Sequence, residues 1–260
     1  MGNAGTAARL SGAPLAVLVV DDDAFNREGV RLYLAQAGFQ VSEAGDEAGA
    51  RLMAAHQLFD AAVLDVSIPA VAGQRAYPAQ SLGIRLAQHL KRQRPRMGIV
   101  LFSAYEDRGQ EVLELLEMGV RGIAYKLKGC RPQLLLEAIH AALQGKVVID
   151  AEVTDTRLLA RELLKRLSVE ERPFVERALG YIDSLTSREW QIADALAASH
   201  SAEGVAEEMG VSLKTVENYI SRLYQKLGLD EVPGHLRRSN LLTKTWLVRS
   251  LSEGDTAHAP

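Results

Sequence analysis

The sequence predicts an α/β protein: a five-stranded, doubly wound parallel sheet, followed by a helical connector and a small all-α domain. Apolar strand-like runs alternate with amphipathic helical patterns from Leu15 to about Lys146, which is typical of βαβ units. Further along the chain, apolar residues recur only at helical spacing. A length of 260 residues, with 47% hydrophobic and 24% charged residues, fits a globular protein of one or two domains.

Five strands and five helices are expected in the domain that spans residues 15–146. The strands are predicted at 16–20, 39–43, 61–65, 98–102 and 122–125. The helices between and after them are predicted at 25–36, 47–56, 82–92, 106–118 and 133–144. Residues 1–14 are small and polar, and we expect a disordered tail there.

Polar side chains follow the expected strands at their carboxyl ends. Asp21 and Asp22 end the first strand, Asp65 the third and Ser103 the fourth, and Lys126 follows the fifth. A single Asp there could merely cap a turn, but converging carboxylates repel each other unless a divalent cation neutralises them. With Mg²⁺ held mainly by Asp21 and Asp22, Asp65 is free to act as nucleophile or phosphoryl acceptor. Ser103 and Lys126 could then bind the oxygens of the transferred group.

Four motifs carry a resemblance to a known family: Val-Val-Asp-Asp, Leu-Asp-Val-Ser-Ile-Pro, Phe-Ser-Ala-Tyr and Gly-Ile-Ala-Tyr-Lys. In this order and approximate spacing they resemble a response-regulator receiver domain. The resemblance implies that Asp65 is phosphorylated by a histidine kinase and that Ser103 is the switch hydroxyl. It also implies Mg²⁺ bound by Asp21, Asp22, Asp65 and the backbone carbonyl of Ser67, with Lys126 as the lysine of the site.

Two features depart from the family pattern. Ile123 stands three residues before Lys126, where the family usually has Tyr or Phe, so the aromatic part of the switch is in question. The loop after Pro69, from Ala70 to Gln80, is longer than in the family. It is either a functional loop or a tolerated surface insertion.

Residues 147–184 are too long for a simple tether and predict two connector helices. Leu159, Leu163 and Leu167 recur at helical spacing, and Pro173 interrupts the pattern before a second helix. Each helix has one apolar stripe. These stripes could pack on the first domain of the same chain or pair across a dimer, and the sequence leaves both open.

Three further helices are expected in the domain that spans residues 185–251, and each has a capping signal at one end. Thr186 and Glu189 form a capping box, a second helix over 202–209 ends at Gly210, and Ser212 caps the third. The third helix should bury Val216, Ile220, Leu223 and Leu227. Its opposite face is polar and suits base edges in a DNA major groove.

The segment from Leu185 to about Leu229 resembles the LuxR-type helix-turn-helix of NarL/FixJ regulators. The resemblance rests on Leu-Thr-Ser-Arg-Glu-Trp and on Val-Ala-Glu-Glu-Met-Gly-Val-Ser-Leu-Lys-Thr-Val-Glu-Asn-Tyr. It implies binding of double-stranded DNA. The expected DNA-binding residues are Lys214, Thr215, Glu217, Asn218, Tyr219, Ser221, Arg222 and Lys226.

Charge and the final helix both point to a dimer. Between Leu185 and Leu251, eight Lys or Arg residues balance eight Asp or Glu residues, so one copy alone should bind DNA weakly. Two copies on a paired site would compensate. A last helix over 240–250 offers a candidate pairing face, formed by Leu241, Leu242, Thr245 and Val248.

The sequence therefore predicts a two-domain response regulator that is phosphorylated on Asp65 and binds DNA as a dimer to regulate transcription. One alternative is a regulator that acts by protein contacts without phosphorylation, and another is a helical module that never touches DNA. An Asp-nucleophile phosphatase is disfavoured because Ser67 replaces the second Asp of that class. One cysteine and the lack of a signal peptide or membrane span indicate a cytoplasmic protein. Residues 252–260 are expected to be a disordered tail.

Overall fold

The computed structural model describes residues 13–77, 80–198 and 200–253. Its first half is a single parallel sheet with the strand order β2-β1-β3-β4-β5-β6. The strands are β1 Ala16–Val20, β2 Gln40–Ala44, β3 Ala61–Leu64, β4 Gly98–Ser103, β5 Ile123–Leu127 and β6 Val147–Ile149. The expected tails, 1–14 and 252–260, lie outside the described residues except for their inner ends.

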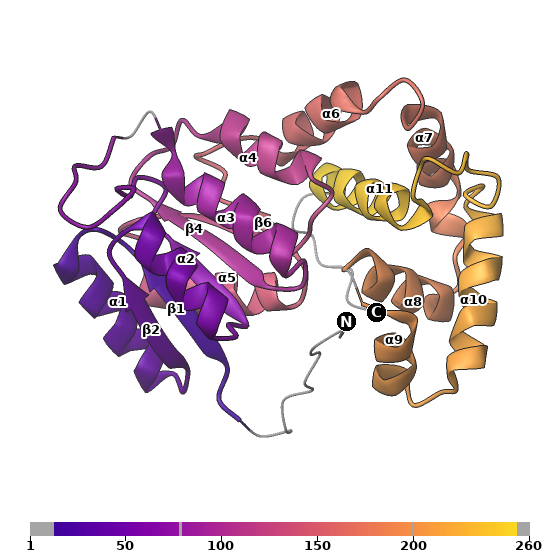
Figure 1. Cartoon of the computed structure of the whole chain (residues 1–260). Helices are drawn as coiled ribbons and strands as arrows, with labels where there is room; N and C mark the ends of the chain where they lie inside the picture. Colours follow the sequence, from indigo (N-terminus) through magenta and orange to yellow (C-terminus); the bar gives the residue numbers. More distant parts are fainter. Residues whose placement is uncertain (1–12, 78–79, 199, 254–260) are drawn as a thin grey trace.

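Helices cover both faces of the sheet (Figure 1). On one face, α1 (Ala24–Gln36) and α5 (Pro132–Leu143) bury Leu34, Leu135 and Ile139 against the strands. On the other face lie α2 (Glu47–His56), α3 (Leu82–Gln93) and α4 (Gly109–Glu117). Because both faces are covered, the central strands read as continuous apolar runs. The doubly wound α/β fold predicted from the sequence is confirmed.

The sheet differs from the prediction at its far edge. It has six described strands rather than five, because Val147–Ile149 pairs in parallel with β5. This three-residue run follows a helix end at Gly145 and is too short to show a strand period, so the sequence assigns it to the connector. β5 ends at Leu127 instead of Tyr125, and this extension matters for the site.

The connector contains the two expected helices, α6 (Thr156–Arg166) and α7 (Arg172–Tyr181), followed by the 3-10 turn η2 (Ile182–Ser184). Leu159 and Leu163 of α6 are buried in one apolar core with α4 of the sheet domain. Of the two packing arrangements that the sequence left open for α6, the structure shows packing within the same chain.

The C-terminal domain consists of α8 (Ser187–Ala197), α9 (Ala202–Met209), α10 (Leu213–Lys226) and α11 (Arg238–Glu253). The capping box of Thr186 and Glu189 is present, and Ser201 and Ser212 cap the next two helices. Gly210, which ends α9, has a φ of 61°, a conformation that suits glycine. The starts of α8 and α10 and the end of α9 therefore lie where local sequence signals place them.

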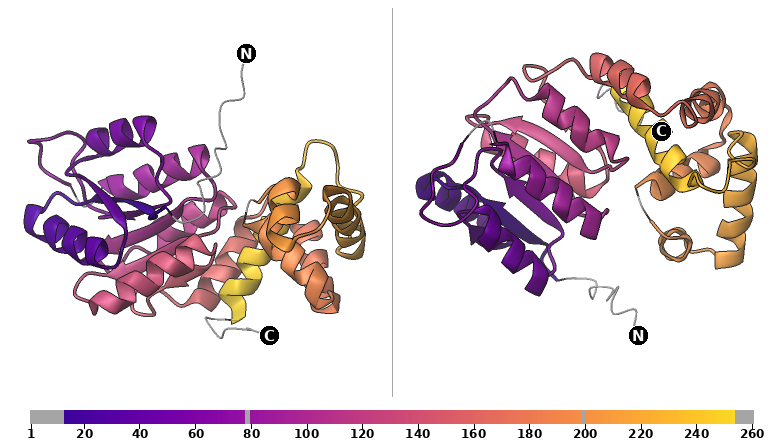
Figure 2. Two further views of the ribbon diagram at one scale, coloured as in Figure 1. Left: turned by 90° about the horizontal axis from the view of Figure 1, so that it is seen from below. Right: turned by 45° about the horizontal axis from the view of Figure 1, so that its top comes forward.

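The prediction that α11 presents a free pairing face is wrong for this arrangement of the chain. Leu241, Leu242, Thr245 and Val248 are each at most 2% exposed. They pack inside the chain, because α11 contacts α6, α7, α8 and β6. In Figure 2, α11 runs in yellow between the sheet domain and the remaining C-terminal helices. None of the helices in the described part of the chain combines the length and apolar character that a bilayer crossing requires.

Candidate functional site

Three carboxylates meet at the carboxyl edge of the sheet. Asp21 follows β1 and Asp65 follows β3, and these strands are neighbours. Together with Asp22, each contributes one oxygen to a group whose atoms all lie within 4.8 Å of one another. Asp21 is 4% exposed and Asp65 is 7% exposed, whereas Asp22 faces solvent. The donor set is entirely carboxylate oxygen, which suits a hard divalent cation such as Mg²⁺.

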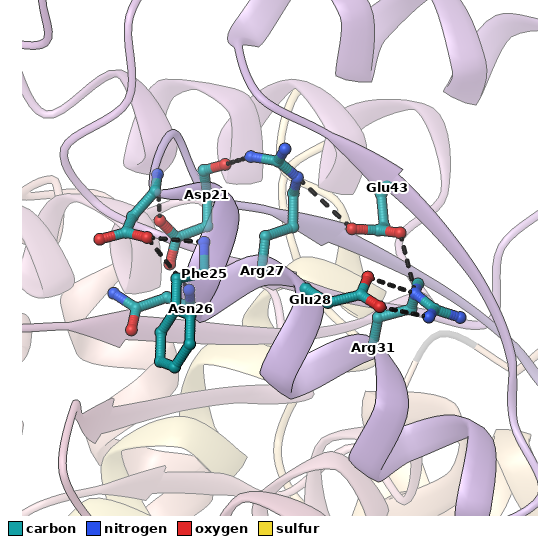
Figure 3. A network of polar contacts seen from close by, with 8 residues as sticks. Asp21, Phe25, Asn26, Arg27, Glu28, Arg31 and Glu43 are labelled. Atoms are coloured by element: carbon teal, nitrogen blue, oxygen red, sulfur yellow. Dashed lines mark hydrogen bonds and ion pairs between the residues drawn. The ribbon is translucent and has the colours of Figure 1, made fainter.

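The start of α1 fixes the orientation of the first carboxylate. Asp23 caps α1 by accepting hydrogen bonds from the amides of Phe25 (2.8 Å) and Asn26 (3.1 Å). The Asp23 amide in turn donates to Oδ1 of Asp21 at 2.9 Å. The Arg27 guanidinium donates to the backbone carbonyl of Asp21, and its Nε lies 3.4 Å from the Glu43 carboxylate (Figure 3). Asp23 and Arg27 therefore hold Asp21 in place without contacting its second carboxylate oxygen, Oδ2.

Helix α3 approaches the phosphoacceptor candidate at a glycine. A Cβ on Gly83 would lie 1.8 Å from the backbone oxygen of Asp65. No side chain can be placed there, so Gly83 allows the first turn of α3 to rest directly on the Asp65 backbone. The Ser67 amide also donates to Oδ1 of Asp65 at 3.1 Å. The sequence analysis did not identify Gly83, because its role depends on a contact between distant segments.

The lysine at the acidic cluster is Lys128. Its Nζ lies 2.7 Å from Oδ2 of Asp65 and 2.8 Å from Oδ2 of Asp21. The expectation that Lys126 occupies this position is wrong, because Lys126 Nζ pairs with the Asp150 carboxylate. The error follows from the length of β5: the strand continues to Leu127, so the first residue beyond it is Lys128.

Burial and pairing act on this cluster in opposite directions. Burial raises the pKa of Asp65, and this effect exceeds the opposing effect of Lys128. Burial would lower the pKa of Lys128, but its hydrogen bonds to Asp21 and Asp65 outweigh burial and raise it. Lys128 is therefore a firmly protonated cation. With three carboxylates and this ammonium, the cluster has a net charge that one divalent ion would neutralise.

The hydroxyl expected to act as the switch and an aromatic ring lie together on the next two strands. Ser103 ends β4, is fully buried, and accepts a hydrogen bond from the Tyr105 amide at 3.1 Å. Tyr125 of β5 is fully buried and donates from its hydroxyl to the Tyr105 carbonyl at 2.7 Å. Burial raises the pKa of Tyr125 to about 12. Tyr125 stands three residues before Lys128, so the ring that Ile123 was thought to replace is present.

The sequence contained a signal for this correction. Two lysines stand two residues apart at the end of this strand run, and only Lys128 has an aromatic residue three positions earlier. The segment Tyr125-Lys126-Leu127-Lys128 therefore matches the family pattern in a second register. The register Gly-Ile-Ala-Tyr-Lys, which begins at Gly122, instead ends at Lys126.

Helix α10 presents the polar face expected for DNA contact. Lys214, Glu217, Asn218, Ser221 and Arg222 are exposed. Val216, Leu223 and Leu227 on its other side are fully buried, and Ile220 is half-buried. In Figure 1, α10 lies at the end of the molecule remote from the sheet. The sheet domain therefore does not cover this helix.

The remaining expected DNA-binding residues are already engaged within the domain. Thr215 takes part in the cap, where its hydroxyl lies 2.8 Å from that of Ser212. Tyr219 is half-buried against the small core of α8, α9 and α10. Lys226 Nζ lies 2.9 Å from the Glu189 carboxylate of the capping box. These three side chains would have to share or exchange partners to reach DNA.

Comparisons with known proteins match both halves of the chain. Residues 17–140 match the family model of the response regulator receiver domain, and residues 183–233 match that of the bacterial regulatory proteins of the luxR family.

Full-length relatives show the same two-part similarity. The chain is 31% identical over 218 residues to the nitrate/nitrite response regulator protein NarP of Escherichia coli K12, covering 83% of this chain and 90% of that protein. It is 28% identical over 220 residues to the response regulator GacA of Pseudomonas aeruginosa, covering 83% and 90%. A solved structure of two RcsB dimers bound to two parallel DNAs is similar with a TM-score of 0.45 and 20% identity, covering 88% of this chain and 96% of that one.

Proposed function

The chain belongs to the NarL/FixJ-type response regulators, which join a receiver domain to a LuxR-type helix-turn-helix domain, and we propose that Asp65 is its phosphoacceptor. The observation that supports this most strongly is the grouping of Asp21, Asp22, Asp65 and Lys128 at one edge of the sheet. The phosphoryl donor is a histidine kinase, and the output is DNA binding that regulates transcription in the cytoplasm.

The phosphorylation step needs a nucleophile and a means of neutralising phosphoryl charge. A carboxylate oxygen of Asp65 attacks the phosphorus of a phosphohistidine. The new O–P bond forms as the P–N bond breaks, and the electron pair remains on the imidazole nitrogen, which takes a proton. Asp21, Asp22, Asp65 and the backbone carbonyl of Ser67 would hold Mg²⁺, which would neutralise charge on the phosphoryl oxygens.

Lys128 and Ser103 bind the phosphoryl oxygens in this proposal. Lys128 already contacts Asp65 and Asp21, and from this position its ammonium would bind an oxygen of the phosphoryl group on Asp65. Ser103 ends β4, the strand next to β3. Tyr105 connects it to the aromatic ring, because the Tyr105 amide donates to the Ser103 hydroxyl and the Tyr105 carbonyl accepts from the Tyr125 hydroxyl. The alternative of a phosphorylation-independent regulator was based on the missing ring at Ile123. Tyr125 provides an aromatic ring three residues before Lys128, so that argument no longer supports the alternative.

The DNA-binding role rests on α10. Its exposed donors and acceptors, above all Asn218, can read base edges, while Lys214 and Arg222 contribute positive charge. The domain has no net positive charge to bind DNA strongly as a single copy. We therefore propose that phosphorylation favours a homodimer that places two copies of α10 on a paired site. If α11 forms part of that dimer, its buried face must first separate from α6.

Intact-mass measurement after incubation with acetyl phosphate and Mg²⁺ tests the receiver assignment. The wild type should gain one phosphoryl group, and Asp65→Asn should gain none. Asp107→Asn is a suitable control, because its carboxylate is exposed and lies in the loop after β4. Equal labelling of wild type and Asp65→Asn would overturn the assignment.

Footprinting on genomic DNA with and without acetyl phosphate tests the output. Protected sites that become occupied at lower protein concentration after labelling would support the proposal. A protein that is labelled on Asp65 but protects no site at any concentration would exclude regulation by direct DNA binding.

A further inference from the structure

The lysine that does not reach the acidic cluster forms a buried ion pair of its own. Lys126 Nζ bonds to the carboxylate of Asp150, and the two side chains are 11% and 16% exposed. Removing two charges from water is costly, so a pair like this adds little net stability compared with apolar residues. Its position on the chain gives it another use.

Asp150 makes hydrogen bonds to three successive residues at the end of β5. Its amide donates to the Tyr125 carbonyl at 3.1 Å, and its carboxylate accepts from Lys126 Nζ and, at 2.9 Å, from the Leu127 amide. The next residue is Lys128, whose amide donates to the Ser103 carbonyl at 2.7 Å and whose ammonium contacts Asp65. The backbone that aims Lys128 at Asp65 is therefore held on one side by Asp150.

Asp150 is also the point where the receiver passes into the connector. It follows β6 directly, and its carbonyl accepts from the amide of Val153 at 2.9 Å in the turn before α6. Val153 is buried in the core shared by α4, α6 and α11. A Cβ on Gly109, the first residue of α4, would lie 3.4 Å from the Thr154 side chain. A shift of Asp150 would therefore move the turn that places α6.

We propose that Lys126 and Asp150 are positioning residues that connect the phosphorylation site to the packing of α6 and α11. This inference rests on the proposed function. Lys128 bridges Asp21 and Asp65 in the structure, and it must leave Asp21 when a cation and a phosphoryl group bind there. Its movement passes through one peptide bond to Leu127, then through the Leu127 amide to Asp150, and from there to the connector.

The ion pair makes Asp150 follow a displacement of the end of β5. If Asp150 held only the Leu127 amide, the end of β5 could slide without moving the connector. The second bond, from Lys126, fixes the carboxylate from a neighbouring residue, so a displaced strand end carries Asp150 with it. Among the residues that the structure describes, no other side-chain hydrogen bond or ion pair joins β5 to the connector.

Tryptophan fluorescence provides the readout, because both tryptophans of the chain lie outside the receiver. Trp190 is in α8 and Trp246 in α11, with their ring centroids 6.0 Å apart. Labelling on Asp65 should change the emission of the wild type as the packing of α11 changes. In Asp150→Asn and Lys126→Met, intact mass should still show one phosphoryl group, but the fluorescence change should be smaller by about two-fold or more.

Two variants separate positioning from general loss of structure. Lys126→Arg keeps a cation for Asp150 and should restore the fluorescence response. Lys165→Met removes an exposed lysine of α6 that pairs with Glu162, and it should respond like the wild type. A merely structural role would lower the melting temperature and leave the response to labelling unchanged.

The outcomes distinguish this inference from the proposed function. If the wild type is not labelled, the receiver assignment fails and this inference fails with it. If the wild type is labelled and responds, but Asp150→Asn and Lys126→Met respond equally, the inference alone is overturned. A wild type that is labelled without any fluorescence change would also overturn it.

Discussion

Replacing Lys128 by Met should make the stability of the protein strongly dependent on Mg²⁺. The substitution removes the ammonium that lies 2.7 Å from Asp65 and 2.8 Å from Asp21, and it leaves three carboxylates within 4.8 Å of one another. Removing one partner of a buried ion pair costs about 3–5 kcal/mol. The Lys128 side chain is 18% exposed, so solvent screening favours the lower end, about 3 kcal/mol.

The expected effect is large enough to measure by thermal unfolding. For a chain of this size, about 3 kcal/mol lowers the melting temperature by roughly 6–12 °C. A divalent ion at about 100 times its dissociation constant returns about 2.7 kcal/mol. In EDTA, Lys128→Met should therefore melt well below the wild type, and Mg²⁺ should raise its melting temperature more than that of the wild type, in which Lys128 already neutralises part of the cluster.

Lys126→Met is the matched control for this experiment. It also removes a lysine from a buried carboxylate, but Asp150 lies outside the acidic cluster. Its loss of stability should be similar in EDTA and should persist in Mg²⁺. Circular dichroism melts of the three proteins over a Mg²⁺ series provide the comparison. If Mg²⁺ stabilised both variants by the same increment, Lys128 would not be the lysine of the metal site.

Three further substitutions test other parts of the structure. Asn218→Ala should cost about 1–3 kcal/mol on the cognate duplex and leave binding to a scrambled duplex unchanged, because it removes a base contact; equal weakening of both titrations would contradict this role. Hydrogen bonds from Lys226 and from the Thr186 amide lower the pKa of Glu189 from its usual 4.5 to about 2, so its stabilising contribution is present above pH 4.5 and is lost as pH falls through about 2. The melting-temperature gap between wild type and Glu189→Gln should close over that range, and a constant gap would argue against the pairing. Leu163→Ala, in the core shared by α4, α6 and α11, should lower the free energy of unfolding by about 2–5 kcal/mol. Leu158→Ala, at a position 51% exposed, should have little effect, and similar losses in urea titrations would refute the packing of α6.

Features that depend on neighbouring residues in the chain were predictable from the sequence. Strand runs such as Ala16–Val20 are apolar because both faces of the sheet are covered, and the helix ends at Thr186, Gly210 and Ser212 follow from capping chemistry. The acidic cluster was also predictable, because parallel strands bring their carboxyl ends to one edge.

Features that depend on strand register and on contacts between distant segments became clear only from the three-dimensional packing. The choice between Lys126 and Lys128 depended on where β5 stops pairing, and its last two residues, beyond Tyr125, still pair with β4. The burial of the α11 face depended on α6, which the sequence could place either in the same chain or in a partner. An apolar stripe indicates that a helix face is buried, but it does not identify the element that buries it, because the hydrophobic effect is not directional.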